Sequence, residues 1–256
     1  MKTSLFYLFL FVTTLSFGQE NLSYQKPPQS ILELAEAPLA PSIQIDSKGK
    51  NIVFLYRSNF KSIEELSETE MRLGGLRINP VTNIGSRTRY FINLKVRVGQ
   101  DGNIQDVNGL PENGRFANFS WSPNQEYMAF TNTVTSGVEL WVLDIENAKA
   151  KKLSQANLNA NMGRPFTWYK DSNSLLVTTL PENRKDLIDT TEAIPTGPTV
   201  SVSEAGVEAQ NRTYQDLLKN KNDEYNFELL TQAELHKINM DGSSSLWKKS
   251  DMYRDV

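Results

Sequence analysis

Two classes of side chain decide what chemistry this sequence could carry out. The chain has one histidine, His236, and no cysteine. A serine nucleophile needs a base that accepts its proton, and the Gly-x-Ser-x-Gly turn that presents such a serine in many hydrolases occurs nowhere in the sequence. With one imidazole and no thiolate, the chain also lacks the usual ligands of a transition metal. We therefore expect no catalytic residues, no metal site and no cofactor in this chain.

Arginines are the second class. Arg77, Arg87 and Arg89 lie close together in the sequence. A guanidinium group binds a carboxylate through two parallel hydrogen bonds, so this cluster could hold an acidic ligand. The same side chains could instead be solvated or pair with acidic residues of the protein, as most surface arginines do. The residues alone leave both interpretations open.

A repeated pattern predicts the elements that must position these side chains. In residues 119–130 an apolar strand, a polar turn and a second apolar strand follow one another, and the pattern recurs in residues 43–54 and 166–177. The copies place Trp121 and Trp168 at equivalent positions, 47 residues apart. That distance is close to the repeat of ~40–50 residues that is typical of propeller blades.

The third strand of the pattern recurs as well. Residues 139–145 match residues 234–240, which places His236 where the other copy has Trp141. We therefore expect His236 to pack within a sheet rather than to act as a base. The tryptophans of the repeat are expected to pack in the same way rather than to line a ligand pocket.

Short antiparallel strands joined by tight turns, with an aromatic residue on the innermost strand, are typical of a β-propeller. We predict an all-β fold: an incomplete propeller of about three four-stranded antiparallel blades over residues 42–256, with short helices in two insertions. The blades begin near residues 42, 117 and 164, and a further blade begins near residue 253. Because closed propellers have ~4–8 blades, we expect the chain to be the N-terminal part of a longer protein.

Two insertions, residues 59–90 and 181–233, interrupt the repeat. In the first insertion, Ser62 and Glu65 have the spacing of a capping box, which predicts a short helix. Long connections within a regular repeat usually lie on one rim and often carry function. For residues 181–210, a connection without function is an equally good interpretation.

Two further helices are predicted outside the regular strands. Thr213 followed by Asp216 predicts a helix in the second insertion. Residues 19–41 are expected to form an extended arm with one short helix at residues 31–36, which Ser30 would cap.

Residues 1–18 have the pattern of a secretory signal peptide. Lys2 is followed by an apolar run from Leu5 to Leu15 and by small residues before Gln19. We therefore expect an exported protein, periplasmic or extracellular, that is not bound to a membrane once the signal is removed. The formal net charge of −3 gives no indication of a nucleic-acid partner.

Several motifs together resemble a known family. The most specific of them lies in the second insertion, which generic propellers lack. The motifs are residues 37–41, 73–78, 83, 86–87, 119–122 and 212–219. With them, the chain resembles the N-terminal propeller of the glutamyl endopeptidases over about residues 27–256. These serine peptidases of the prolyl oligopeptidase superfamily include a chloroplast enzyme and secreted bacterial relatives.

The resemblance implies that this chain belongs to a peptidase but does not itself contain the catalytic residues. In such enzymes the propeller caps an α/β-hydrolase domain, which lies downstream in the same polypeptide and carries a Ser-Asp-His triad. The propeller excludes folded proteins and admits peptides, which are cleaved after acidic residues. By this resemblance, Arg77, Arg87 and Arg89 are the candidates for binding the acidic side chain of the substrate.

A function of another class fits the same repeats. A periplasmic TolB-like or WD40-like propeller acts as a binding scaffold and needs no catalytic domain. In that case further blades would close the ring, and no Gly-x-Ser-x-Gly turn would follow them.

Overall fold

The computed structural model describes residues 25–189, 206 and 215–254. The chain separates into two compact units, Met1–Pro38 and Leu39–Val256. The predicted signal peptide, residues 1–18, lies outside the described residues. In the described part of the chain, no helix is long and apolar enough to cross a membrane.

The first unit has one described helix, α2 (Gln29–Glu36). The prediction that Ser30 caps this helix is wrong: Pro28 is the N-cap residue, and no side chain makes a capping hydrogen bond. Proline suits the start of a helix because its φ is fixed near the helical value and it has no N–H to leave unpaired. Within the helix, Gln29 Nε2 donates a hydrogen bond to Glu33 Oε1 over 3.1 Å.

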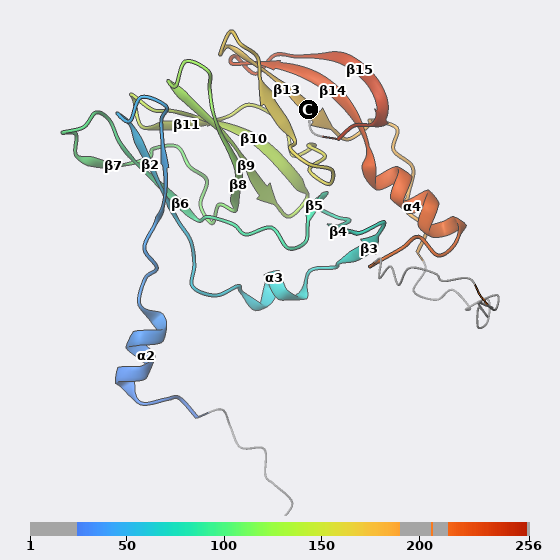
Figure 1. Ribbon diagram of the computed structural model, residues 1–256, viewed down its shortest axis with the longest axis horizontal. Coiled ribbons are helices and arrows are strands. Elements are labelled where there is room, and N and C mark those ends of the chain that lie inside the picture. Colours follow the sequence, from blue (N-terminus) through green and yellow to red (C-terminus); the bar gives the residue numbers. More distant parts are fainter. Residues whose placement is uncertain (1–24, 190–205, 207–214, 255–256) are drawn as a thin grey trace, which may run out of the picture. The chain divides into compact units, whose positions relative to one another are not determined.

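The described part of the second unit contains three four-stranded antiparallel sheets, in each of which successive strands of the repeat are neighbours (Figure 1). The predicted all-β fold, a partial propeller, is confirmed, and we call the three sheets blades 1, 2 and 3. Blade 1 consists of β1 (Ser42–Ile45), β2 (Ile52–Tyr56), β6 (Asn93–Arg97) and β7 (Ile104–Asp106). Blade 2 consists of β8 (Phe116–Trp121), β9 (Tyr127–Val134), β10 (Gly137–Asp144) and β11 (Lys149–Lys152). Blade 3 consists of β12 (Phe166–Trp168), β13 (Ser174–Thr179), β14 (Gln232–Asn239) and β15 (Ser244–Met252).

The strand register agrees with the alignment of the repeats. Phe130 of β9 lies opposite Trp141 of β10, and Val177 of β13 lies opposite His236 of β14. Directly opposed residues share one face of a sheet, so His236 and Trp141 occupy the same position in successive blades.

The core consists of two apolar layers, one between each pair of neighbouring blades. Val53 and Leu94 of blade 1 pack in one cluster with Phe130 of blade 2. On the other face of blade 2, Leu140 packs in a second cluster with Leu175 of blade 3. Burial of each such side chain contributes about 1.5–3 kcal/mol, so each blade stabilises the next by covering its apolar face.

The tryptophans of the repeat pack as predicted. Trp141 is buried, and its ring stacks on that of Phe130 with a centroid distance of 6.4 Å. Trp121 is partly buried against the first cluster and Trp168 against the second. The Trp168 Nε1–H donates to the Ser120 carbonyl over 3.1 Å, which joins the innermost strands of blades 2 and 3.

The first insertion forms a short helix and a small sheet. Helix α3 (Ile63–Ser67) has the predicted capping box: the Glu65 N–H donates to Ser62 Oγ over 3.1 Å, and the Ser62 N–H donates to Glu65 Oε2 over 3.2 Å. The chain then forms a three-stranded antiparallel sheet of β3 (Met71–Leu73), β4 (Leu76–Asn79) and β5 (Ile84–Gly85).

The second insertion contains α4 (Lys221–Thr231), which leads directly into β14. Asn220 is its N-cap residue and accepts a backbone N–H over 2.9 Å. The prediction of a helix that begins at Thr213 is wrong for residues 215–219, which are not helical, and Thr213 itself lies outside the described residues. Asp216 has a φ of +55°, in the left-handed region, and a right-handed helix does not pass through such a residue.

Candidate functional site

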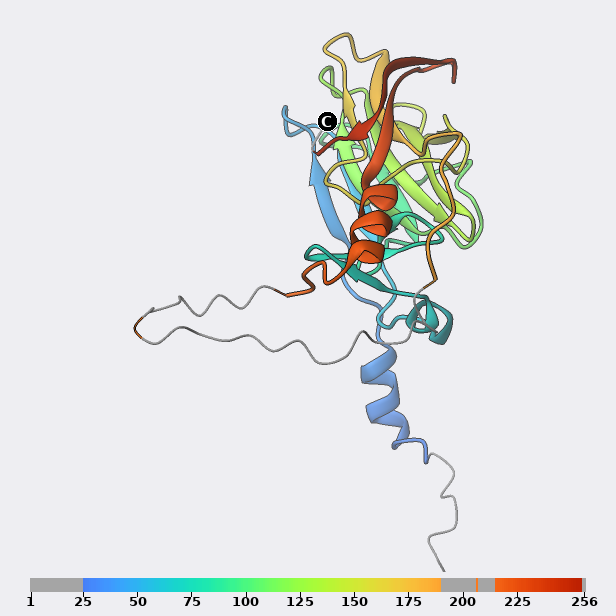
Figure 2. The same ribbon diagram turned by 90° about the vertical axis from the view of Figure 1, so that its right-hand side faces the viewer.

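The two insertions pack against each other. Each connects the second strand of its blade to the third, so both leave the sheets at the same end. Leu73 and Ile78 of the first insertion form a small core with Leu230 of α4, and Figures 1 and 2 show β3, β4 and α4 side by side. Gly74 lies at the contact: its φ is +56°, and a Cβ atom there would lie 2.7 Å from the Phe227 ring. We call β3–β5 together with α4 and Asp216 the rim cap.

Arg77, one of the three predicted arginines, joins the two halves of the rim cap. Its Nη2 lies 3.1 Å from Asp216 Oδ2 of the second insertion, and its Nη1 lies 3.2 Å from Glu70 Oε1 of the first. The Gly75 N–H also donates to the Asp216 carbonyl over 3.3 Å. These contacts hold Asp216 in its left-handed conformation.

Glu70 is the centre of a second set of contacts, which we call the Glu70 cluster. Its carboxylate accepts hydrogen bonds from Ser86 Oγ over 2.6 Å, Arg72 Nε over 2.8 Å, Arg77 Nη1 over 3.2 Å and Arg87 Nε over 3.3 Å. The bonds from Ser86 and from the three arginines lower the pKa of Glu70 from 4.5 to about 2. The structure therefore engages two of the predicted arginines, Arg77 and Arg87, with a carboxylate of the protein itself.

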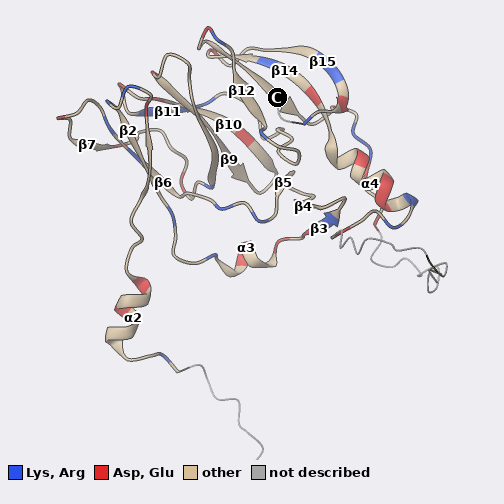
Figure 3. Cartoon of the chain, viewed as in Figure 1, with Lys and Arg blue, Asp and Glu red and all other residues tan. Residues whose placement is uncertain are grey.

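Arg89, the third predicted arginine, lies apart from this cluster. It is exposed and lines a cavity of about 1340 Å³ that is bordered by the α3 segment and by blades 1 and 2. Arg57 and Lys61 line the same cavity and are also exposed. Within the described residues, none of these three cations forms an ion pair. Figure 3 shows basic and acidic residues interspersed along the first insertion, around α3 and β3.

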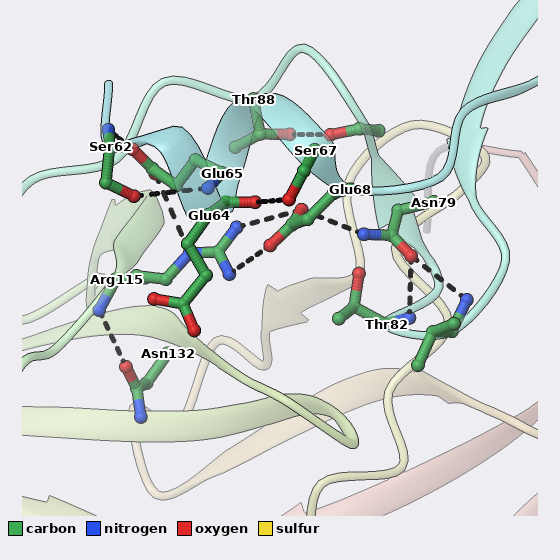
Figure 4. A network of polar contacts seen from close by, with 12 residues as sticks. Ser62, Glu64, Glu65, Ser67, Glu68, Asn79, Thr82, Thr88, Arg115 and Asn132 are labelled. Atoms are coloured by element: carbon green, nitrogen blue, oxygen red, sulfur yellow. Dashed lines mark hydrogen bonds and ion pairs between the residues drawn. The ribbon is translucent and has the colours of Figure 1, made fainter. Parts of the chain in front are cut away.

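Arg115 fixes one wall of the cavity (Figure 4). Its Nη1 and Nη2 donate to the two carboxylate oxygens of Glu68 over 2.6 and 3.3 Å, and Asn79 Nδ2 donates to the same carboxylate over 2.9 Å. The guanidinium lies 4.3 Å from the centre of the Tyr90 ring. Burial alone would lower the pKa of Arg115, but the bonds to Glu68 raise it, so the group stays charged.

No pattern in the sequence indicates this role of Arg115. The residue immediately precedes β8, outside both insertions, and only the folding of the first insertion brings Glu68 to it. A paired guanidinium that also covers an aromatic ring is a positioning contact: it holds the α3 segment against blade 2.

His236 lies on blade 3 and does not line the cavity. Its Nε2 is 3.3 Å from Glu234 Oε2, and its Nδ1 is 3.2 Å from Ser244 Oγ. Blade 2 makes the corresponding contact, since the Trp141 Nε1–H donates to Glu139 Oε2 over 2.8 Å. In both blades 2 and 3, a ring nitrogen of the side chain at this position therefore contacts the glutamate two residues earlier in the strand. No group of three or more metal-binding side chains occurs among the described residues.

Two curated proteins match the chain over most of its length. A probable chloroplastic glutamyl endopeptidase of Arabidopsis thaliana is 29% identical over an alignment of 232 residues that covers 86% of this chain and 24% of the relative. A probable chloroplastic glutamyl endopeptidase of Oryza sativa subsp. japonica is 29% identical over an alignment of 235 residues that covers 87% of this chain and 25% of the relative. The chain is similar to the glutamyl endopeptidases. It spans about a quarter of the length of these relatives.

No family model matches the chain. Among solved structures, an acylaminoacyl peptidase of Pyrococcus horikoshii matches 86% of this chain and 25% of its own, with a TM-score of 0.40 and 13% identity. A putative TolB of Agrobacterium tumefaciens matches 85% of this chain and 84% of its own, with a TM-score of 0.31 and 8% identity. Both structures differ too much from this chain, in sequence and in shape, for an argument about its function to rest on them.

Proposed function

We propose that this chain is the propeller portion of an exported serine peptidase that cleaves peptides after acidic residues. The catalytic triad belongs to an α/β-hydrolase domain in another part of the same polypeptide, and the propeller limits access to it. The observation that carries the proposal is the similarity to two proteins named as probable glutamyl endopeptidases, over 86% and 87% of this chain.

Exposed apolar side chains at the rim support a covering domain. Phe60, Ile63 and Leu66 lie in and around α3 and are 68%, 86% and 69% exposed. Single exposed apolar residues are ordinary, but neighbouring ones on one short segment indicate a surface that another domain covers. In the proposed enzyme, the hydrolase domain covers this surface.

The outer face of blade 1 supports additional blades. Ile43 lies opposite Phe54, and Ile45 lies opposite Ile52, so these side chains share the face that points away from blade 2. Ile43 and Ile45 are 53% and 48% exposed, and Ile104 of the same blade is 54% exposed. Blade 2 buries the equivalent face against blade 1, so a further blade would cover this one in the same way.

The activity is tested with the protein expressed from its complete gene. It should hydrolyse chromogenic peptides that have Glu at the cleaved position and leave the matched Gln peptides intact. It should also cleave short peptides while sparing a folded protein that contains the same sequence. Cleavage of Gln and Glu peptides at equal rates would overturn the acidic specificity. A complete gene product that binds peptides and cleaves none would instead favour the binding scaffold.

Export is tested separately, by fractionation of the cells that produce the protein. The periplasmic or secreted fraction should contain a chain whose N-terminus is Gln19, because the apolar run and small residues before it have the pattern of a cleaved signal. A chain that is found in the cytoplasm and still begins at Met1 would overturn this part of the proposal.

A further inference from the structure

We propose that the cavity beside α3 binds an extended peptide, and that Arg57, Lys61 and Arg89 hold its acidic side chains. This inference rests on the proposed function for the peptide nature of the ligand. It goes beyond that function by naming the site, and it separates Arg89 from the other two arginines of the sequence cluster.

The cations lie where the chain leaves blade 1 and returns to it. Tyr56 and Asn93 form the last pair of the β2–β6 ladder, and the Ile92 N–H donates to the Tyr56 carbonyl over 2.7 Å. Arg57 directly follows Tyr56, and Arg89 lies four residues before Asn93 on the segment that returns to the blade, so both residues belong to the same end of blade 1. Arg57 and Arg89 line the cavity and form no ion pair among the described residues, so both can bind a carboxylate of a ligand.

A buried hydroxyl gives an independent indication of a ligand. Thr82 lines the cavity and is 3% exposed, and its Oγ1 has no hydrogen-bond partner among the described residues. Its backbone N–H is held by Asn79 Oδ1 over 3.2 Å, so the residue is fixed in place. Figure 4 shows the hydroxyl turned toward the side on which Glu68 lies. The Oγ1 atom is almost inaccessible to solvent, so a polar ligand reaches it only after a small shift of the wall, and the new hydrogen bond would then remove the cost of an unpaired buried polar group.

The balance of charge favours a peptide over a polyanion. The cavity wall carries four cations, Arg57, Lys61, Arg89 and Arg115, and four carboxylates, Glu64, Glu65, Glu68 and Glu112. Its formal charges therefore balance, whereas nucleic-acid sites are strongly basic. Interspersed charges suit a ligand with separate carboxylates along a flexible chain.

The size of the cavity favours a peptide over a small molecule. Its volume of about 1340 Å³ exceeds the ~300–1,000 Å³ that is typical of small-molecule pockets. The wall is built from several separate segments of the chain, among them residues 57–62, 111–115 and 132–135.

The test is a binding measurement with the full chain that needs no catalysis. The probe is a short fluorescein-labelled peptide in which Glu alternates with Ala, and its anisotropy is compared with that of the matched Gln peptide. The Glu peptide should bind and lose affinity as salt rises, because charged contacts are screened. Arg89→Ala and Arg57→Ala should each weaken binding about tenfold, as expected for a lost charge-assisted hydrogen bond.

Arg72→Ala is the matched control. Arg72 belongs to the same insertion and is exposed, but it bonds Glu70 and does not line the cavity. Its removal should leave the affinity unchanged. Equal affinity for the Glu and Gln peptides, or an equal loss in Arg72→Ala and Arg89→Ala, would overturn the inference.

The two proposals can fail separately. If the complete gene product cleaves after Glu while Arg57→Ala and Arg89→Ala bind and react normally, the cavity is not the site and the proposed function stands. If the cavity binds the Glu peptide through these arginines and the complete gene product cleaves nothing, the site stands and the peptidase function does not.

Discussion

The Glu70 cluster and the cavity wall both contain arginines and glutamates of the first insertion, yet they differ in what their charges can do. In the cluster, Arg72, Arg77 and Arg87 all converge on the carboxylate of Glu70. On the wall, Arg57, Lys61 and Arg89 line an open cavity and form no ion pair within the described residues. The first set stabilises the fold of the insertion, and the second is available for a ligand.

This difference shows that the neighbours of an arginine, and not its position in the sequence, decide whether it can bind an acidic ligand. Arg87 and Arg89 are two residues apart, but only Arg87 reaches Glu70. In the rim cap, Arg77 pairs with both Asp216 and Glu70, beside the apolar contacts between the insertions. Substitutions in the rim cap, in the Glu70 cluster and on the cavity wall should therefore have separate effects.

Gly74→Ala should have the largest effect on stability, because it disrupts the packing between the two halves of the rim cap. The new Cβ would lie 2.7 Å from the Phe227 ring, at a φ of +56° that disfavours alanine. We expect a loss of about 2–3 kcal/mol in the free energy of unfolding, measured with urea. Gly75→Ala is the control: its φ is +81°, but nothing lies within 4 Å of its Cβ position, so only about 1 kcal/mol should be lost. Equal losses in the two variants would show that the insertions do not pack closely at Gly74.

Glu70→Gln should have the next largest effect, since it removes the charge on which three arginines converge. We expect a loss of about 1–2 kcal/mol at neutral pH. Because folding lowers the pKa of Glu70 from 4.5 to about 2, its contribution is fully present above pH 4.5 and is lost as the pH falls toward 2. Urea unfolding at a series of pH values should therefore show the wild-type advantage shrinking through this range. A difference that stays constant with pH would contradict the cluster.

Arg115→Lys should have a smaller and more local effect, on the cavity wall. Lysine keeps the charge but cannot donate two parallel bonds to Glu68 or cover the Tyr90 ring as a flat group. We expect a loss of about 1 kcal/mol and faster hydrogen exchange in α3, with exchange in β3 and β4 unchanged. Faster exchange throughout the first insertion would mean that the wall and the cluster are not separate units.

Arg72→Ala should have the smallest effect. The side chain is 57% exposed, and Glu70 keeps its bonds from Ser86, Arg77 and Arg87 when it is removed. Exposed ion pairs contribute little, so we expect a change of less than about 0.5 kcal/mol in urea unfolding. A loss as large as that of Glu70→Gln would show that the cluster depends on each of its members.

The features that could be predicted from the sequence are local ones. The alternation of apolar and polar residues, with a turn between two strands, predicted the blades. It also matched His236 to Trp141, and the register, with His236 opposite Val177 and Trp141 opposite Phe130, agrees with that match. The capping box of Ser62 and Glu65 needed only their spacing. Pro28 was a local signal as well, and its preference for helix starts explains the position at which α2 begins.

The features that could not be predicted depend on contacts between distant segments. Asp216 looked like part of a capping box, but its contacts with Gly75 and Arg77 go with a left-handed conformation, and the helix begins later. Arg115 gave no signal because its partner, Glu68, is 47 residues away. The role of an arginine cluster likewise depends on where Glu70 comes to lie.

By itself, the sequence determined the repeating blades and the resemblance to the glutamyl endopeptidases, because strand periodicity, turn residues and short motifs are written in neighbouring positions. Which cations are neutralised and which line the cavity depends on the tertiary structure. A charge is neutralised by whatever group the fold brings within hydrogen-bond distance, and here the fold brings Glu70 to Arg87 and leaves Arg89 at the cavity.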